Sequence, residues 1–228
     1  MTDSNHYSSG MSVLPMPQPF TCEVRHFPLK RAFDIAFSAS VLAIFLPLLL
    51  LIALMIRLTS KGKVIYHQER IGRGGQTFRC YKFRTMYADA EAKLKDILQN
   101  DAEKRQEWER NHKLKNDPRI TRIGAFLRKT SLDEFPQFWN VLKGDLSVVG
   151  PRPVVREEII RHFGPKAYKI LSVRPGLTGL WQISGRSDTS YAARVAFDEQ
   201  YVDNCSFLLD LKLVALTIPS MIFSKGAY

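Results

Sequence analysis

The longest apolar stretch of the chain runs from Ile35 to Ile56 and contains no charged residue. A helix over these residues would be roughly 33 Å long, which matches the hydrocarbon thickness of a bilayer. No polar stripe interrupts the run, as it would in a helix that borders a soluble core. The pattern therefore predicts a membrane helix, which we place at residues 30–60.

The flanks and the middle of this helix are compatible with two paths through the bilayer. Basic residues lie beyond both ends of the run: Arg25, Lys30, Arg31, Arg57, Lys61 and Lys63. Charge at both ends gives no preferred orientation under the positive-inside rule. Pro47, near the middle, removes a backbone hydrogen bond and kinks a helix. A re-entrant hairpin and a spanning helix with a tolerated proline fit these residues about equally well.

Alternation of apolar and polar residues follows the membrane segment, in residues 64–69 and 76–83, on either side of the glycine-rich segment 72–75. This pattern predicts a small β-hairpin, with the glycines as its turn. Alternation places Lys82 and Arg84 on the same side of the second strand. They would either bind one anion together or stand as two solvated cations.

Helical periodicity dominates the rest of the chain, so the predicted fold class is α+β and mostly helical. Residues 88–113 mix both signs of charge and predict a solvated helical arm. Residues 154–168 predict a further helix, and the glycine-rich segment 173–186 predicts a loop. The apolar segment 206–223 predicts an amphipathic helix that lies at the membrane interface.

Composition adds a strong positive charge to this picture. The 228 residues include 33 Lys and Arg against 22 Asp and Glu, a net charge of +11. An anionic partner is therefore expected, either nucleic acid, an anionic membrane surface or a phosphorylated substrate. Three separated cysteines and five scattered histidines provide neither a disulfide framework nor a zinc pattern. The first 29 residues, rich in Ser and Pro, predict a disordered tail.

Two adjacent acids, Asp133 and Glu134, stand out in this basic chain. The spacing of Ser131 and Glu134 matches a capping box, which would make Glu134 a helix-capping residue. The alternative is a reactive site, because acids at a turn can serve as one nucleophile and one metal ligand. Arg128 lies one turn upstream and Arg152 sits between two prolines, where both would frame a bound phosphate.

Several long motifs occur in order and carry a family resemblance: "KRAFDI", "QERIGRGGQTFRCYKFRTM", "DPRITRIGAFLRKTSLDEFPQFWNVLKGDLSVVGPRP" and "RPGLTGLWQISGR". From Lys30 to Tyr228 the chain resembles the bacterial sugar transferases, the monotopic phosphoglycosyl transferases that act on polyprenyl phosphate. It is most similar to the short enzymes that begin exopolysaccharide repeat units. Leu46 precedes the membrane proline, where some members carry serine.

The resemblance implies a re-entrant helix kinked at Pro47 and a catalytic domain, residues 61–228, on the cytosolic face of the inner membrane. It implies that Asp133 is the nucleophile and that Glu134 and Asp133 hold Mg²⁺. Phosphate or substrate would be bound by basic side chains at Lys82, Arg84, Arg128, Arg152 and Arg186.

The implied reaction transfers a hexose 1-phosphate from a UDP-sugar to undecaprenyl phosphate through a covalent aspartyl intermediate, and UMP is released. The expected partners are these two substrates and inner-leaflet lipid, without nucleic acid, and an oligomer is compatible with the sequence. A non-enzymatic rival is a basic membrane tether that binds nucleic acid or anionic lipid. Interleaved acids and prolines interrupt the continuous basic face that such a tether would need. The identity of the sugar is left open.

Overall fold

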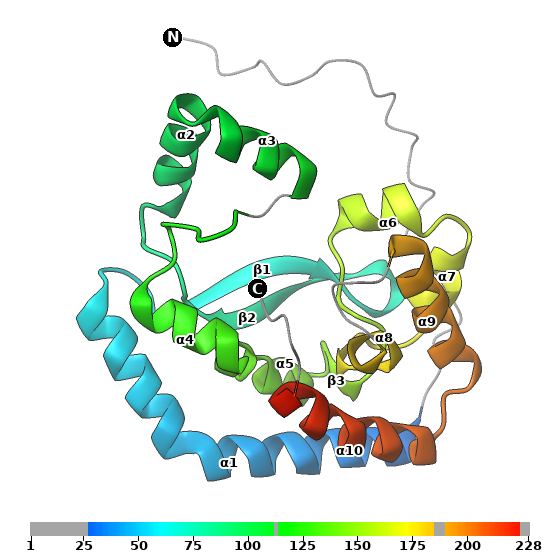
Figure 1. Ribbon diagram of the computed structural model, residues 1–228. Coiled ribbons are helices and arrows are strands. Elements are labelled where there is room, and N and C mark those ends of the chain that lie inside the picture. Colours follow the sequence, from blue (N-terminus) through cyan, green and yellow to red (C-terminus); the bar gives the residue numbers. More distant parts are fainter. Residues whose placement is uncertain (1–26, 112–113, 185–189, 224–228) are drawn as a thin grey trace, which may run out of the picture.

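The computed structural model describes residues 27–111, 114–184 and 190–223. Figure 1 shows a long N-terminal helix along the base, a β-hairpin above it, a helical arm to one side and shorter helices on the other. The chain is mostly helical with little strand, as the sequence predicted. The predicted disordered tail lies outside the described residues, apart from its last positions, which already belong to the first helix.

Helix α1, Pro28–Thr59, contains the apolar run and carries Pro47 inside it. It is long and apolar enough to cross a bilayer, and only 11% of its most apolar window is buried within the protein. The helix changes direction along its length, so that its second part rises away from the base (Figure 1). A proline within the helix accounts for such a bend, because it removes one backbone hydrogen bond and crowds the preceding turn.

Polar side chains attach the start of α1 to the globular part. Lys30 Nζ lies 2.7 Å from Asp210 and 2.8 Å from the carbonyl oxygen of Val149. Buried Asp34 accepts hydrogen bonds from the Ser147 hydroxyl at 3.0 Å and the Val148 N–H at 2.9 Å. Because these groups are withdrawn from water, leaving one unpaired would cost about 1–3 kcal/mol. The first turns of α1 are therefore fixed to the domain.

The hairpin consists of β1, Ile65–Ile71, and β2, Thr77–Phe83, joined through a short 3-10 turn, η1, Arg73–Gly75. The strands are antiparallel, with Tyr66 opposite Lys82. Gly74 adopts a φ of +69°, a conformation that glycine enters without steric cost. The predicted hairpin and its glycine turn are both confirmed.

The arm consists of α2, Ala90–Asn100, and α3, Ala102–Asn111, which stand away from the rest (Figure 1). Next come α4, Arg122–Thr130, the one-turn helix η2, Leu132–Glu134, and α5, Gln137–Lys143. The chain then forms β3, Ser147–Val149, followed by α6, Arg156–His162, and α7, Lys166–Ile170. The helix predicted over 154–168 is wrong as one element, because the chain turns at Gly164, where φ is +50°.

The last third corrects a second prediction. Residues 173–186 were expected to form a loop, but they contain β4, Gly176–Thr178, and α8, Leu180–Ile183. Strand β4 pairs in parallel with β3. A Cβ on Gly176 would lie 2.0 Å from the backbone nitrogen of Gly150, so glycine is required for the backbones to approach. Helices α9, Tyr191–Asp203, and α10, Phe207–Phe223, complete the fold.

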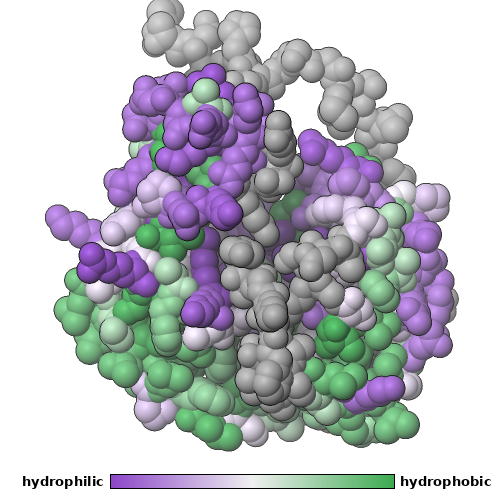
Figure 2. Space-filling model, in the orientation of Figure 1, coloured by the Kyte–Doolittle hydropathy of each residue, from purple (hydrophilic) through white to green (hydrophobic). Residues whose placement is uncertain are grey.

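Apolar residues gather on the lower face of the molecule (Figure 2). Helices α1 and α10 lie side by side there in both ribbon views, and the Phe33 and Phe207 rings meet at 5.7 Å. Exposed apolar side chains include Ile44 and Leu50 of α1 and Leu208 of α10, together with Phe126 of α4 and Trp139 of α5. A contiguous apolar surface of this kind is typical of contact with a membrane or a partner.

Candidate active site

The two acids lie on η2, a single turn between α4 and α5. Ser131, which precedes the turn, has a left-handed φ of +57°, and this reverses the chain direction after α4. Leu132 and Phe135, on either side of the acids, pack against a buried cluster that includes Ile52 and Ile56 of α1. The turn is thus anchored through its apolar residues to the second part of α1.

The capping role considered for Glu134 is not observed. The Ser131 side chain makes no capping hydrogen bond, and the Ser131 N–H donates to the carbonyl of Arg128. The Glu134 carboxylate instead lies 2.6 Å from Lys82 Nζ on β2. The acids are therefore directed toward the hairpin, and helix capping does not explain them.

Asp133 is buried, with 9% of its surface exposed. Burial and, to a smaller extent, the neighbouring charge of Glu134 raise the pKa of Asp133 to about 6, against the opposing charges of Lys82 and Arg128. At neutral pH the group is mostly ionised, yet poorly solvated. A carboxylate in this state is more nucleophilic than one in bulk water, because less hydration must be removed before it reacts.

Glu134 is in the opposite electrostatic situation. Nearly half of its side chain is exposed, although protein atoms crowd the carboxylate. This crowding opposes ionisation, but the Lys82 salt bridge and the charges of Arg152 and Arg70 outweigh it and lower the pKa of Glu134. The environment therefore separates the two pKa values. Asp133 titrates near neutrality, and Glu134 stays charged.

Helix α4 positions Arg128 beside the buried acid. Thr121 caps the helix by accepting a hydrogen bond from the Gly124 N–H at 2.9 Å. A Cβ on Gly124 would lie 1.9 Å from the carbonyl oxygen of Thr85, so only glycine allows α4 to approach so closely. Arg128 Nε then donates to the Thr85 hydroxyl at 2.9 Å, and its charge acts on Asp133.

Arg152 is held from behind by a second group of residues. Its guanidinium lies 4.9 Å from the centre of the Trp181 ring, and that of Arg194 lies 5.1 Å from the same ring. The Arg152 backbone N–H donates to buried Asp198, whose pKa is raised to about 7, mainly by burial. These contacts fix the orientation of Arg152 and leave its charge to act on Glu134.

The structure brings together Asp133, Glu134, Lys82, Arg128 and Arg152. Arg84 is placed differently. Its guanidinium donates to the carbonyl oxygens of Ser60 and Lys61, each at 2.8 Å, at the end of α1. Alternation was extended one residue too far along the strand, because β2 ends at Phe83 and Arg84 follows it. Arg186 lies outside the described residues.

Three charged residues near the site were missed by the sequence interpretation: Arg70, Arg194 and Asp198. Arg70 acts on Glu134 and belongs to β1, four residues after the cross-strand partner of Lys82. The short turn of the hairpin fixes the strand register, so this signal was present in the sequence. Asp117 and Arg119, assigned no role, form a buried ion pair with a shortest distance of 2.6 Å.

Chemically, the site is a pair of carboxylates surrounded by cations. Metal-ligating side chains do not form a cluster of three or more within residues 27–111, 114–184 and 190–223. The surplus of positive charge suits polyanionic substrates such as diphosphates, while the buried carboxylate is suited to attack an electrophilic phosphorus.

Comparison with known proteins gives consistent matches. The family model for bacterial sugar transferases matches residues 25–224. An exopolysaccharide production protein, ExoY, of Rhizobium meliloti is 48% identical over 199 residues, 87% of this chain and 88% of that protein. The undecaprenyl-phosphate galactose phosphotransferase of Salmonella typhimurium is 48% identical over 88% of this chain. The UDP-glucose:undecaprenyl-phosphate glucose-1-phosphate transferase of Escherichia coli is 38% identical over 96% of it. The chain spans 42% and 46% of these last two relatives, respectively.

The electrostatics of Asp133 can be measured by NMR titration of metal-free protein labelled with ¹³C at the aspartate carboxyls, with Asp133→Asn to assign the signal. We expect a midpoint about two pH units above that of an ordinary aspartate, near pH 6. Lys82→Gln removes a charge that favours ionisation, so the midpoint should rise by roughly 0.3–1 unit.

Arg84→Gln is the matched control for Lys82→Gln, because it removes a neighbouring cation whose hydrogen bonds go to the end of α1. It should leave the Asp133 midpoint in place and lower the thermal unfolding temperature instead. A midpoint near pH 4 in the unsubstituted protein, or equal shifts in the two variants, would contradict this electrostatic description.

Proposed function

The chain belongs to the bacterial sugar transferase family, and from this membership and the site geometry we propose that it is a polyprenyl-phosphate hexose-1-phosphate transferase. A hexose 1-phosphate passes from a UDP-sugar to undecaprenyl phosphate, and UMP is released. The observation that carries the proposal is a buried carboxylate, Asp133, within a group of cations on a turn anchored to the membrane helix. Its named relatives are sugar-phosphate transferases, so the chain is an enzyme and not the basic tether that composition also allowed.

In the first step, an Asp133 oxygen attacks the sugar-bearing phosphorus. The bond from that phosphorus to the bridging oxygen breaks, and its electron pair leaves with UMP. In the second step, an oxygen of polyprenyl phosphate attacks the same phosphorus and releases the Asp133 carboxylate. No proton is needed in either displacement. Dividing the transfer in two is the advantage of covalent catalysis, and ionised, poorly solvated Asp133 is suited to it.

The basic side chains support both steps electrostatically. Arg128 stands beside the attacking carboxylate, and Lys82 and Arg152 stand around its neighbour. Phosphoryl transfer places charge on the phosphoryl oxygens, so preorganised cations lower its barrier. The Thr85 hydroxyl and the Trp181 ring fix two of these arginines before substrate arrives.

Glu134 and Asp133 are the residues that would hold Mg²⁺. The donor set fits this ion, because Mg²⁺ is bound through one or two carboxylates with waters and substrate phosphates completing the shell. Glu134 has the required exposure and stays ionised, since nearby cations lower its pKa. When bound, the ion would offset charge on the phosphates and weaken the repulsion between the two acids.

Contacts at both ends of α1 support a re-entrant path. Lys30 and Asp34 bind the domain near the start of the helix, and Arg84, next to the hairpin, binds its last carbonyls. Both ends therefore contact the same globular part, and the bend at Pro47 is compatible with a return to one face. We place the domain on the cytosolic face of the inner membrane, where the UDP-sugar is available.

The nucleophile is tested with purified protein, labelled UDP-sugars and a polyprenyl phosphate. We expect the unsubstituted protein to release UMP and not UDP. In Asp133→Asn, turnover should fall at least about a thousandfold. Asp96→Asn, a substitution on the exposed arm, is the matched control and should retain full turnover. EDTA should abolish the reaction and Mg²⁺ restore it. Normal product formation by Asp133→Asn would exclude its role, and UDP release would indicate a different transfer.

The topology is tested by labelling single cysteines in a background in which Cys22, Cys80 and Cys205 are serine. Leu29→Cys and Lys63→Cys place exposed thiols at the two ends of α1. A membrane-impermeant maleimide should label both in inside-out vesicles and neither in intact spheroplasts. Labelling of the two positions from opposite faces would mean that α1 spans the membrane.

A further inference from the structure

The cations around the acid pair act on two different sides of it. The main positive charges that act on Asp133 are those of Lys82 and Arg128. The main positive charges that act on Glu134 are those of Lys82, Arg152 and Arg70. Lys82 is common to both, whereas Arg128 acts mainly on Asp133, and Arg70 and Arg152 act mainly on Glu134.

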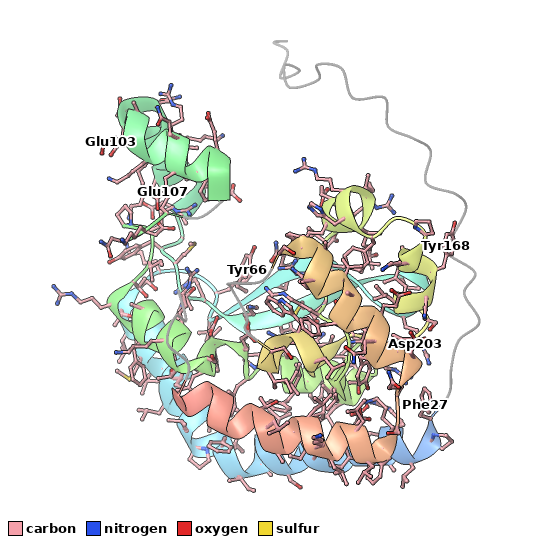
Figure 3. All side chains as sticks on the ribbon, turned by 45° about the vertical axis from the view of Figure 1, so that its right-hand side comes forward. Phe27, Tyr66, Glu103, Glu107, Tyr168 and Asp203 are labelled. Atoms are coloured by element: carbon pink, nitrogen blue, oxygen red, sulfur yellow. The ribbon has the colours of Figure 1, made fainter. Side chains whose placement is uncertain are left out.

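Arg70 reaches this position through the geometry of the hairpin. Every second residue of β1 lies on the same face of the hairpin, and this face carries Tyr66, Gln68 and Arg70. Their partners on β2 are Lys82, Cys80 and Phe78, respectively. Tyr66, labelled in Figure 3, belongs to this face, and buried Cys80 on the same face shows that its middle packs against the domain. Arg70 lies about 13 Å further along the strand than Tyr66, at roughly 3.3 Å per residue.

A backbone contact brings Arg70 close to Arg152. The N–H of Ile71 donates to the carbonyl oxygen of Val154 at 2.9 Å, and the two residues form an antiparallel bridge. The end of β1 is thereby joined to the segment that carries Arg152. The charges of the two arginines act on each other, as those of near neighbours do.

Arg70 is oriented but not neutralised. Its Nη2 donates to Gln68 Oε1 at 2.7 Å, and its side chain is half-buried. Within the described part of the chain it forms no ion pair with a carboxylate, in contrast to the buried pair of Arg119 and Asp117. An oriented, partly desolvated guanidinium without a counter-ion is suited to bind an anion.

We propose that Arg70, together with Arg152, binds the phosphate that leaves with the nucleotide. The inference rests on the proposed function. In an in-line displacement, the attacking oxygen and the leaving oxygen lie on opposite sides of the phosphorus. Arg128 stands on the Asp133 side, with the transferred phosphoryl group. The two arginines on the Glu134 side then face the leaving phosphate and stabilise the charge that it gains when the bond to the bridging oxygen breaks.

This assignment is tested by nucleotide binding to the full-length protein in nanodiscs, with UMP and uridine as probes. Arg70→Gln should weaken UMP binding by about tenfold or more and leave uridine binding unchanged, because uridine lacks the phosphate. Arg70→Lys keeps the charge but not the fork of donors, and we expect an intermediate loss. Arg79→Gln, on the other face of the same hairpin, is the control and should match the unsubstituted protein.

Kinetic measurements distinguish binding of the leaving phosphate by Arg70 from binding of the acceptor phosphate. Without acceptor, Arg70→Gln should slow single-turnover UMP release by about 10²-fold, as removal of one preorganised donor does. The KM for polyprenyl phosphate should stay within about twofold. Unchanged UMP affinity in a folded Arg70→Gln protein, or a loss confined to the KM of polyprenyl phosphate, would overturn the assignment. Failure of the unsubstituted protein to release UMP would instead overturn the proposed function.

Discussion

The site depends on one local constraint, the packing of a single turn against the long apolar helix α1. Leu132, the first residue of η2, and Phe135, the residue after it, are apolar. They flank Asp133 and Glu134 in the sequence. Their burial beside Ile52 and Ile56 forces the intervening acids toward the hairpin, where Lys82 meets Glu134. Leu132 and Phe135 are partly buried, so each contributes a fraction of the about 1.5–3 kcal/mol that full burial is worth, and together they hold the turn that desolvates Asp133. The raised pKa of Asp133 follows from this packing.

The same packing joins the acid pair to α1 at a second point. The Phe45 ring of α1 packs edge-on against Phe135 at 5.3 Å, one residue after the acid pair. The turn that carries the carboxylates is therefore packed against α1 on both sides of the acid pair. We propose that this packing holds the reactive group at the membrane surface, where the headgroup of a lipid-linked phosphate would lie.

Much of this could be predicted from the sequence, where one local signal is strong. The charge-free apolar run predicted α1, and alternation around the glycines predicted the hairpin. The ordered motifs indicated the family. Among the site residues, Lys82, Arg128 and Arg152 were predicted to lie near the acids, and the structure brings them there. The assigned chemistry of these residues is still a prediction.

What failed depends on contacts between distant segments. Strands β3 and β4 are each three residues long, and they pair although almost thirty residues separate them in the sequence. Such short strands carry too weak a local pattern to be predicted. Gly176 was interpreted as a loop residue because glycine is common in loops. Its actual role is to let two backbones approach closely, which the sequence alone does not show. Arg84 looked like a site residue because alternation was extended past the end of β2. The hairpin register already placed Arg70 on the same face as Lys82, but its proximity to Arg152 depends on the distant bridge between Ile71 and Val154.

The most direct test of the account is to isolate the covalent intermediate. Protein incubated with Mg²⁺ and a UDP-sugar labelled in the sugar, without lipid acceptor, is quenched and digested under acidic conditions, and its peptides are mapped by mass spectrometry. The account predicts a hexose phosphate on the peptide that contains Asp133, which disappears when polyprenyl phosphate is added before the quench. Label on another residue, or UMP release without any adduct on the protein, would contradict it.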